Sequence, residues 1–120
     1  MAHPGPIPAQ VFDDLGRRIV IRLFRPHTFF QRLRGLIGRE PPRHGEGWWF
    51  VRCGAIHTFG MRYPIDVLHL SASGTILAIR HRLAPGRISC FQGTFQILEL
   101  GTGRAQALSL SVGGRLEIRP

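Results

Sequence analysis

The sequence of 120 residues contains no lysine, few acidic residues and no long apolar run, and each absence narrows what the protein can be. All 16 basic residues are arginines, against seven aspartates and glutamates, so the net charge is +9. No stretch approaches the roughly 18 apolar residues needed for a membrane-spanning helix. The N-terminal MAHPGPIPAQ lacks the basic start and apolar run of a secretory signal, so a cytoplasmic location is expected by default.

The surplus of positive charge favours contact with a polyanion, an anionic membrane surface or an acidic partner. No zinc-finger spacing, aromatic RNA-binding signature or Gly-rich phosphate loop accompanies it. Binding to nucleic acid or anionic lipid would therefore rest on charge alone and depend on salt, and it is kept as an alternative that is not favoured. The arginines that could form such a surface crowd the first third of the chain: Arg17, Arg18, Arg22, Arg25, Arg32, Arg34, Arg39 and Arg43.

The sequence predicts a flexible lead over residues 1–15 and a single domain over residues 16–120. Alternation in GRRIVIRLFR (16–25) predicts a half-buried strand with Ile19, Ile21 and Leu23 on one face. A short helix is predicted over residues 28–37, because Thr28 and Gln31 form a capping-box pattern and Gly38 is a natural stop.

Further strands are predicted along the rest of the chain. WWFVRC (48–53) reads as a strand, residues 54–64 as irregular, and residues 66–83 as a hairpin around SASG. TFQILEL (94–100) is another strand, residues 101–110 include one helical turn, and residues 112–118 form a turn and a last strand. With 15 glycines and nine prolines, the pattern predicts a mainly β (β-rich α+β) fold. We expect a compact antiparallel barrel or sandwich with one or two short helices.

Four runs occur in an order and spacing that carry a family resemblance. They are RLRGLIGR (32–39), IHTFGMRYPIDVLHL (56–70), TILAIRHRLAPGR (75–87) and ILELGTG (97–103). Together they resemble the domain-of-unknown-function 192 family of bacteria and archaea, over about residues 16–119. The resemblance implies a compact β-rich fold of this size and no particular activity, because the family is uncharacterised. Many members of the family look exported. The resemblance therefore also suggests an envelope-associated or secretion-associated role, by association with those members and without a mechanism.

The family's recurrent positions map onto six residues of this chain. The HTFGM run marks a subgroup with its own His-Thr, and Cys53 and Cys90 belong to the same subgroup pattern. The matched residues are Gly35, Leu36, Phe59, Met61, Asp66 and Glu99.

Two carboxylates lie on strand faces that should be buried. Alternation places Asp66 with Leu68 and Leu70, and Glu99 with residues 95 and 97. A buried carboxylate needs partners, such as Arg62 or backbone N–H groups, because an unpaired buried charge is costly. The alternative is functional: both carboxylates converge on a pocket as acid–base groups or ligands.

Cys53 and Cys90 are the only cysteines, and three interpretations stay open. They could be two unrelated buried thiols. They could form a disulfide, worth about 4 kcal/mol, in an oxidising compartment. They could also form a metal or thiol-active site with His57, and with Met61 as a further donor, since sulfur and nitrogen ligands suit zinc or cuprous copper.

The residues of HTFGM complete the candidate site. His57 can be a ligand, a general base or a hydrogen-bonded structural residue, and Met61 can be part of the core. The leading hypothesis is a small non-enzymatic binding or accessory domain without a cofactor, whose cleft engages a small ligand or a partner protein. The cleft would be formed by His57, Thr58, Phe59, Met61, Asp66 and Glu99.

Overall fold

The computed structural model describes residues 4–120, apart from the side chains of residues 29 and 30. Its centre is a five-stranded sheet in the order β3-β4-β9-β6-β7. Neighbouring strands are antiparallel except for β3 and β4, which are parallel. The strands are β3 (Arg22–Phe24), β4 (Glu46–Val51), β6 (Ile65–Leu70), β7 (Ile76–Leu83) and β9 (Gln96–Gly101).

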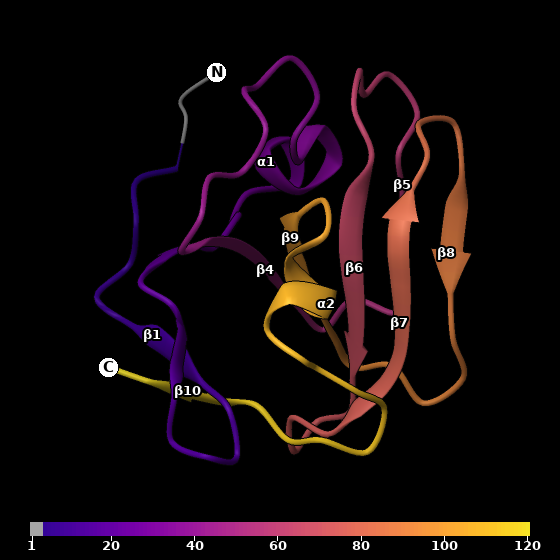
Figure 1. Cartoon of the computed structure of the whole chain (residues 1–120). Coiled ribbons are helices and arrows are strands. Elements are labelled where there is room, and N and C mark those ends of the chain that lie inside the picture. Colours follow the sequence, from indigo (N-terminus) through magenta and orange to yellow (C-terminus); the bar gives the residue numbers. More distant parts are fainter. Residues whose placement is uncertain (1–3) are drawn as a thin grey trace.

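Two smaller sheets and two short helices are the other regular elements of the described residues (Figure 1). A three-stranded sheet has the order β10-β1-β2, and β5 and β8 form a separate two-stranded ribbon. The mainly β, sandwich-like fold with short helices is therefore confirmed, without a closed barrel. The remaining elements are β1 (Gln10–Phe12), β2 (Arg18–Val20), α1 (Phe29–Arg34), β5 (Ala55–His57), β8 (Ile88–Cys90), α2 (Arg104–Ala107) and β10 (Glu117–Arg119).

The central sheet carries a separate apolar layer on each face. Along β6, the even-numbered Leu68 and Leu70 pack in one cluster, whereas Ile65 and Val67 pack in the other. The first cluster, called here the closed layer, also contains Val11 and residues of the three-stranded sheet. The second cluster, called here the pocket layer, lies under α1 and the β5–β8 ribbon.

The segment at residues 16–25 departs from the predicted single strand. Ile21 is half exposed and separates β2 from β3, and its N–H and that of Arg22 both donate to the Gly45 carbonyl. The chain changes sheets here, since β2 pairs with β1 whereas β3 pairs with β4. The prediction that Ile19, Ile21 and Leu23 share one buried face is therefore wrong at Ile21.

The prediction of a flexible lead over residues 1–15 is wrong at residues 10–12, which form β1. β1 pairs with both β10 and β2, and Val11 at its centre is fully buried in the closed layer. Residues 1–3 of the lead lie outside the described residues. Pairing with β10, at the other end of the chain, supplies order that the local composition does not indicate.

The capping box of the predicted helix is confirmed. Thr28 Oγ1 accepts from the Gln31 N–H, and the Gln31 side chain accepts from the Thr28 N–H. The helix ends at Gly35, which has a positive φ, and so is shorter than the predicted range of 28–37. Because α1 lies on the connection between the parallel strands β3 and β4, it covers one side of the pocket layer.

Candidate functional site

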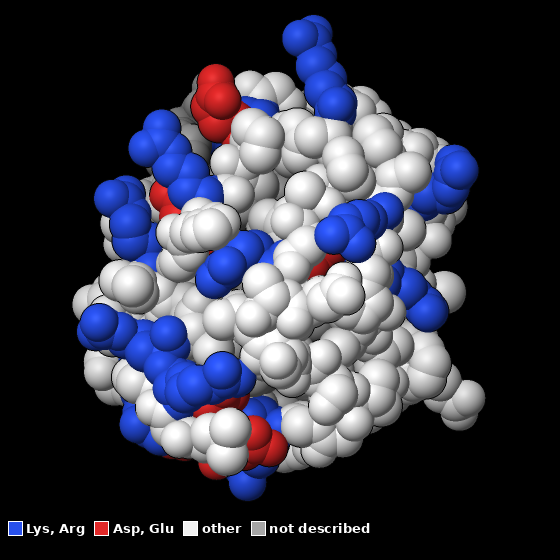
Figure 2. Space-filling model, in the orientation of Figure 1, with Lys and Arg blue, Asp and Glu red and all other residues white. Residues whose placement is uncertain are grey.

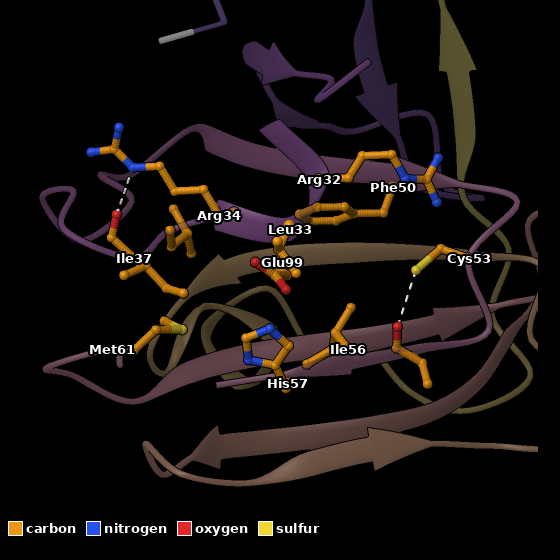
Figure 3. A pocket seen from close by; sticks show the side chains of 13 residues that line it. Arg32, Leu33, Arg34, Ile37, Phe50, Cys53, Ile56, His57, Met61 and Glu99 are labelled. Atoms are coloured by element: carbon orange, nitrogen blue, oxygen red, sulfur yellow. Dashed lines mark hydrogen bonds between the residues drawn. The ribbon is translucent and has the colours of Figure 1, made fainter. Parts of the chain in front are cut away.

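A cavity of about 270 Å³ opens in the pocket layer, between α1, β4, β9 and β5. Its walls are mostly apolar, with Phe50 from β4 on one side and Ile56 from β5 on the other (Figure 3). It combines two of the sequence-predicted site residues from the HTFGM run, His57 and Met61, with Glu99 from β9. The full lining consists of residues 32–37, Phe50, Cys53, Ala55, Ile56, His57, Met61 and Glu99.

Glu99 is the buried polar group of this cavity. Its side chain comes from the middle of β9, opposite Trp48 and Val67 on the neighbouring strands, and the residue is 4% exposed. No described group makes a hydrogen bond or an ion pair with its carboxyl group. Burial raises the pKa of Glu99 to about 8, so the carboxyl group is mostly protonated at neutral pH.

His57 lies across the cavity from Glu99, and the two side chains face one another in Figure 3. The ring is held by the turn that follows β5, because the Phe59 N–H donates to Nδ1 at 3.2 Å. The Phe59 ring also stacks on the imidazole, with ring centroids 5.4 Å apart. Phe59 is itself half exposed and supports His57 from outside the cavity.

Two arginines of α1 stand at the rim of the cavity. Arg32 donates to the carbonyls of Val51 and Arg52, and Arg34 donates to the carbonyl of Ile37. Both guanidinium groups point away from Glu99 in Figure 3. Neither forms an ion pair with an acidic residue among the described residues, so their positive charges remain uncompensated near the mouth.

Asp66 does not belong to this cavity. Its neighbour in register on β9 is Leu100, and it lies on the face of the closed layer, opposite to the face of Glu99. The two carboxylates therefore do not converge, and the prediction that they share a cleft is wrong. The reason is register: Val67, not Asp66, lies opposite Glu99, and adjacent residues of a strand point to opposite faces.

The partners of Asp66 are backbone N–H groups. Its carboxylate accepts from the N–H of Arg82 at 2.9 Å, Gly103 at 3.1 Å and Ala105 at 2.8 Å. These bonds fix the start of α2 and the end of β7 against β6. The structure thus selects backbone pairing among the sequence-based alternatives, and no bond or ion pair joins Asp66 to Arg62.

Thr58 is also a structural residue. It is fully buried, and its hydroxyl donates to the Ala84 carbonyl at 2.7 Å and accepts from the Arg87 N–H at 2.9 Å. These bonds join the HTFGM turn to the loop between β7 and β8. Thr58 therefore positions His57 from behind the cavity wall.

The two cysteines are free and do not assemble with His57. Cys53 lines the cavity and its thiol donates to the Ala55 carbonyl at 3.1 Å, whereas Cys90 is exposed on β8. No three His, Cys, Asp or Glu side chains come together anywhere in residues 4–120. The proposed metal set of Cys53, His57 and Cys90 is therefore not formed by the described chain.

A second polar cluster is closed to ligands. His69 Nε2 lies 2.7 Å from the Ser89 hydroxyl, and Nδ1 lies 3.1 Å from that of Thr94. The arrangement resembles a nucleophile and its base, but His69 is fully buried and Ser89 is 3% exposed. Burial lowers the pKa of His69 to about 4, with a smaller effect from Arg80. The cluster holds β6 to β8 as a neutral hydrogen-bonded network.

The arginines serve mainly as structural groups. Figure 2 shows them spread around the visible face with uncharged surface between them. Several cover aromatic rings: Arg25 lies over Trp49 at 5.1 Å, and Arg39 lies over Trp48 at 5.2 Å. The described part of the chain holds no helix that could cross a membrane.

The sequence indicated only part of the cavity. His57, Met61 and Glu99 were candidates, but the apolar wall formed by Phe50, Ile56 and the end of α1 was not anticipated. The RLRGLIGR run could have indicated it, because loops that follow a short helix on a rigid scaffold often carry binding residues. β5 and β8 were also missed, since three-residue strands give too short an alternation to recognise.

Comparison with known structures shows the same fold in proteins of low sequence identity. A protein of unknown function from Novosphingobium aromaticivorans is 22% identical, with a TM-score of 0.79 over 97% of this chain and 93% of its own. A candidate transcription regulator from Sinorhizobium meliloti is 23% identical, with a TM-score of 0.83 over 98% and 96%. A candidate exported protein from Burkholderia pseudomallei is 17% identical, with a TM-score of 0.52 over 92% of this chain and 24% of its own.

No protein with a curated description matches this sequence. The sequence model of DUF192, described as "Uncharacterized ACR", matches residues 13–118. That range includes the central sheet, both helices and every residue that lines the cavity. The chain belongs to the domain-of-unknown-function 192 family.

Proposed function

We propose that this protein is a small binding domain, and that its cavity holds a small apolar ligand through a polar contact with Glu99. The observation that carries the proposal is the Glu99 carboxyl group, which belongs to a residue that is 4% exposed, forms no hydrogen bond or ion pair with the described residues and lines a cavity. Because Glu99 lines the cavity, its carboxyl group is open to a ligand there. A hydrogen bond within a protein typically contributes about 0.5–1.5 kcal/mol.

The size of the cavity favours a small molecule over a folded partner. Its volume of about 270 Å³ lies just below the usual range for ligand pockets. Phe50, Ile56 and Met61 would contact an apolar part of the ligand, which contributes affinity by burial. Binding rather than catalysis is proposed because no hydrogen bond joins Cys53 to His57 and the Ser89–His69 pair is buried.

A methyl group inside the cavity allows a direct test. Met61 lines the cavity, and Met1 is the only other methionine, so ¹³C-methyl labelling gives two signals. Hexanol, hexylamine and hexanoate share one apolar stem and are suitable probes. We expect at least one of them to shift the Met61 signal in a saturable manner in nuclear magnetic resonance titrations.

A matched pair of variants controls this experiment. Ile56→Trp would fill the cavity and should abolish the shift, whereas Val112→Trp changes an exposed side chain outside it and should leave the shift intact. Failure of all three probes, or an equal shift in Ile56→Trp, would rule out the cavity as the binding site.

The two free cysteines bear on the cellular compartment of the protein. We propose the cytoplasm, because Cys53 and Cys90 are free thiols and such pairs persist in reducing compartments. The envelope alternative draws on the description of the Burkholderia protein, which is 17% identical and therefore similar in fold alone. Cell fractionation with an antibody against the native chain tests it, and recovery in the envelope fraction would contradict the proposal.

A further inference from the structure

We infer that the ligand of this cavity is a carboxylate on an apolar stem, held between His57 and Glu99. The inference rests on the proposed function and adds the chemical class of the ligand. Its basis is that His57 and Glu99 present hydrogen-bond donors to the cavity while two arginines stand at its rim, so the site matches an acceptor that carries negative charge.

His57 presents a donor because its other nitrogen is already engaged. The Phe59 N–H donates to Nδ1, so Nδ1 is the nitrogen with the lone pair and Nε2 carries the proton of the neutral ring. The ring faces Glu99 across the cavity in Figure 3. No hydrogen bond joins the two side chains, so the Nε2–H is available to a third group lying between them.

Glu99 presents a second donor. Burial without a basic partner keeps its carboxyl group protonated at neutral pH, in agreement with a pKa of about 8. A protonated carboxyl group donates one hydrogen bond through its O–H. A carboxylate has two oxygens with free lone pairs, so it can accept from His57 and Glu99 at the same time.

The charges at the rim favour an anionic ligand over a cationic ligand. Arg32 and Arg34 line the cavity and have no acidic partner among the described residues. They create a positive potential at the mouth, and the net charge of +9 adds to it. An ammonium ligand would pass these charges and then require Glu99 to ionise. A carboxylate would be attracted by the same charges and would leave Glu99 neutral.

The remaining walls suit the apolar stem. Leu36, Phe50, Ile56 and Met61 present carbon and sulfur atoms to the cavity. The other titratable groups close to Glu99 are the Cys53 thiol, which donates to the Ala55 carbonyl, and the Tyr63 hydroxyl. The pKa of Tyr63 is raised to about 12, chiefly by burial, so Tyr63 stays neutral over the pH range of the experiment.

The experiment compares the three six-carbon probes by Met61 methyl titration between about pH 7 and pH 9. We expect hexanoate to bind more tightly than hexanol, and hexanol more tightly than hexylamine. Hexanoate affinity should fall as pH rises through about 8, because Glu99 then ionises, no longer donates a hydrogen bond and repels the ligand. Above this pH the decrease in affinity should approach tenfold per pH unit.

Two variants separate the contributions of the two side chains. Glu99→Gln keeps a hydrogen-bond donor without a titratable group, so hexanoate affinity should become nearly independent of pH between about 7 and 9. His57→Phe keeps an aromatic ring without the Nε2–H, so hexanoate affinity should fall about fivefold or more while hexanol affinity changes less.

The outcomes distinguish this inference from the proposed function. If hexylamine binds most tightly and its affinity rises with pH, the cavity is a binding site and the carboxylate inference is overturned. Equal affinity of hexanol and hexanoate without pH dependence overturns it as well. If no probe shifts Met61, the proposed function fails together with this inference.

Discussion

At the scale of single residues, Asp66 shows how one carboxylate can organise several backbone segments. It is fully buried and accepts N–H groups from β7, from the turn before α2 and from α2 itself. Of these bonds, the one from Ala105 is buried and the other two are partly buried. Asp66 therefore acts on the stability of the fold, and its place on the opposite face of the sheet from Glu99 separates it from ligand binding.

We expect Asp66→Ala to lower the free energy of unfolding by about 3 kcal/mol or more, because one buried and two partly buried N–H groups lose their acceptor. Asp66→Asn keeps one acceptor oxygen and should lose less. Urea denaturation followed by circular dichroism measures both variants. A fully stable Asp66→Ala variant would contradict the structural role assigned to this residue.

The cysteines give a second prediction at this scale. Without reductant, both thiols should be alkylated by iodoacetamide in denaturant, since they are free. In the native protein Cys90 should react first, because it is exposed whereas Cys53 is partly buried. Intact mass spectrometry with peptide mapping follows the reaction. Protection of both thiols until reductant is added would indicate a disulfide instead.

At the scale of elements, the β6–β7 hairpin is fastened to the C-terminal segment at Gly74. This residue has a φ of +91°, and its carbonyl accepts the Leu116 N–H at 2.9 Å. A Cβ atom at this position would overlap the Leu116 carbonyl oxygen. The hairpin turn therefore requires glycine both for its backbone conformation and for the close approach of the C-terminal segment at Leu116.

We expect Gly74→Ala to destabilise the protein by more than about 2 kcal/mol, from backbone strain and the clash together. Gly86→Ala is the matched control. Gly86 also has a positive φ, of +77°, but nothing lies near its Cβ position, so only about 1 kcal/mol of strain is expected. Thermal unfolding of both variants tests whether the contact with Leu116 accounts for the difference.

The elements also show what the sequence could and could not predict. The hairpin, the capping box and the β9 strand have strong local signals, and the structure contains all three. β1 was missed because its order comes from pairing with β10 at the other end of the chain. The site was only partly predicted, since alternation indicates which residues of one strand share a face but not the register that places Val67 opposite Glu99.

At the scale of the whole molecule, two buried groups set how stability depends on pH. The pKa of Glu99 is raised to about 8, so the stability present at low pH is lost as pH rises toward 8. The pKa of His69 is lowered to about 4, so the stability present above pH 6.5 is lost as pH falls through 4. The two effects oppose each other between pH 4.5 and 6.5.

We therefore expect the free energy of unfolding to decrease by about 2 kcal/mol between about pH 6.5 and pH 8, where Glu99 acts without His69. Glu99→Gln should remove this decrease, because glutamine does not titrate. Urea midpoints measured across this range for both proteins check the expectation. An unchanged slope in Glu99→Gln would show that another group controls stability there.

The two apolar layers of the central sheet have a consequence for how this fold can diversify. Substitutions in the cavity wall alter the pocket layer, whereas the closed layer on the other face keeps its own packing. Adjacent residues of β6 and β9 belong to different layers, so selection can change ligand preference at one residue without disturbing its neighbour's role in folding. The fold can in this way serve as a stable carrier for a variable site.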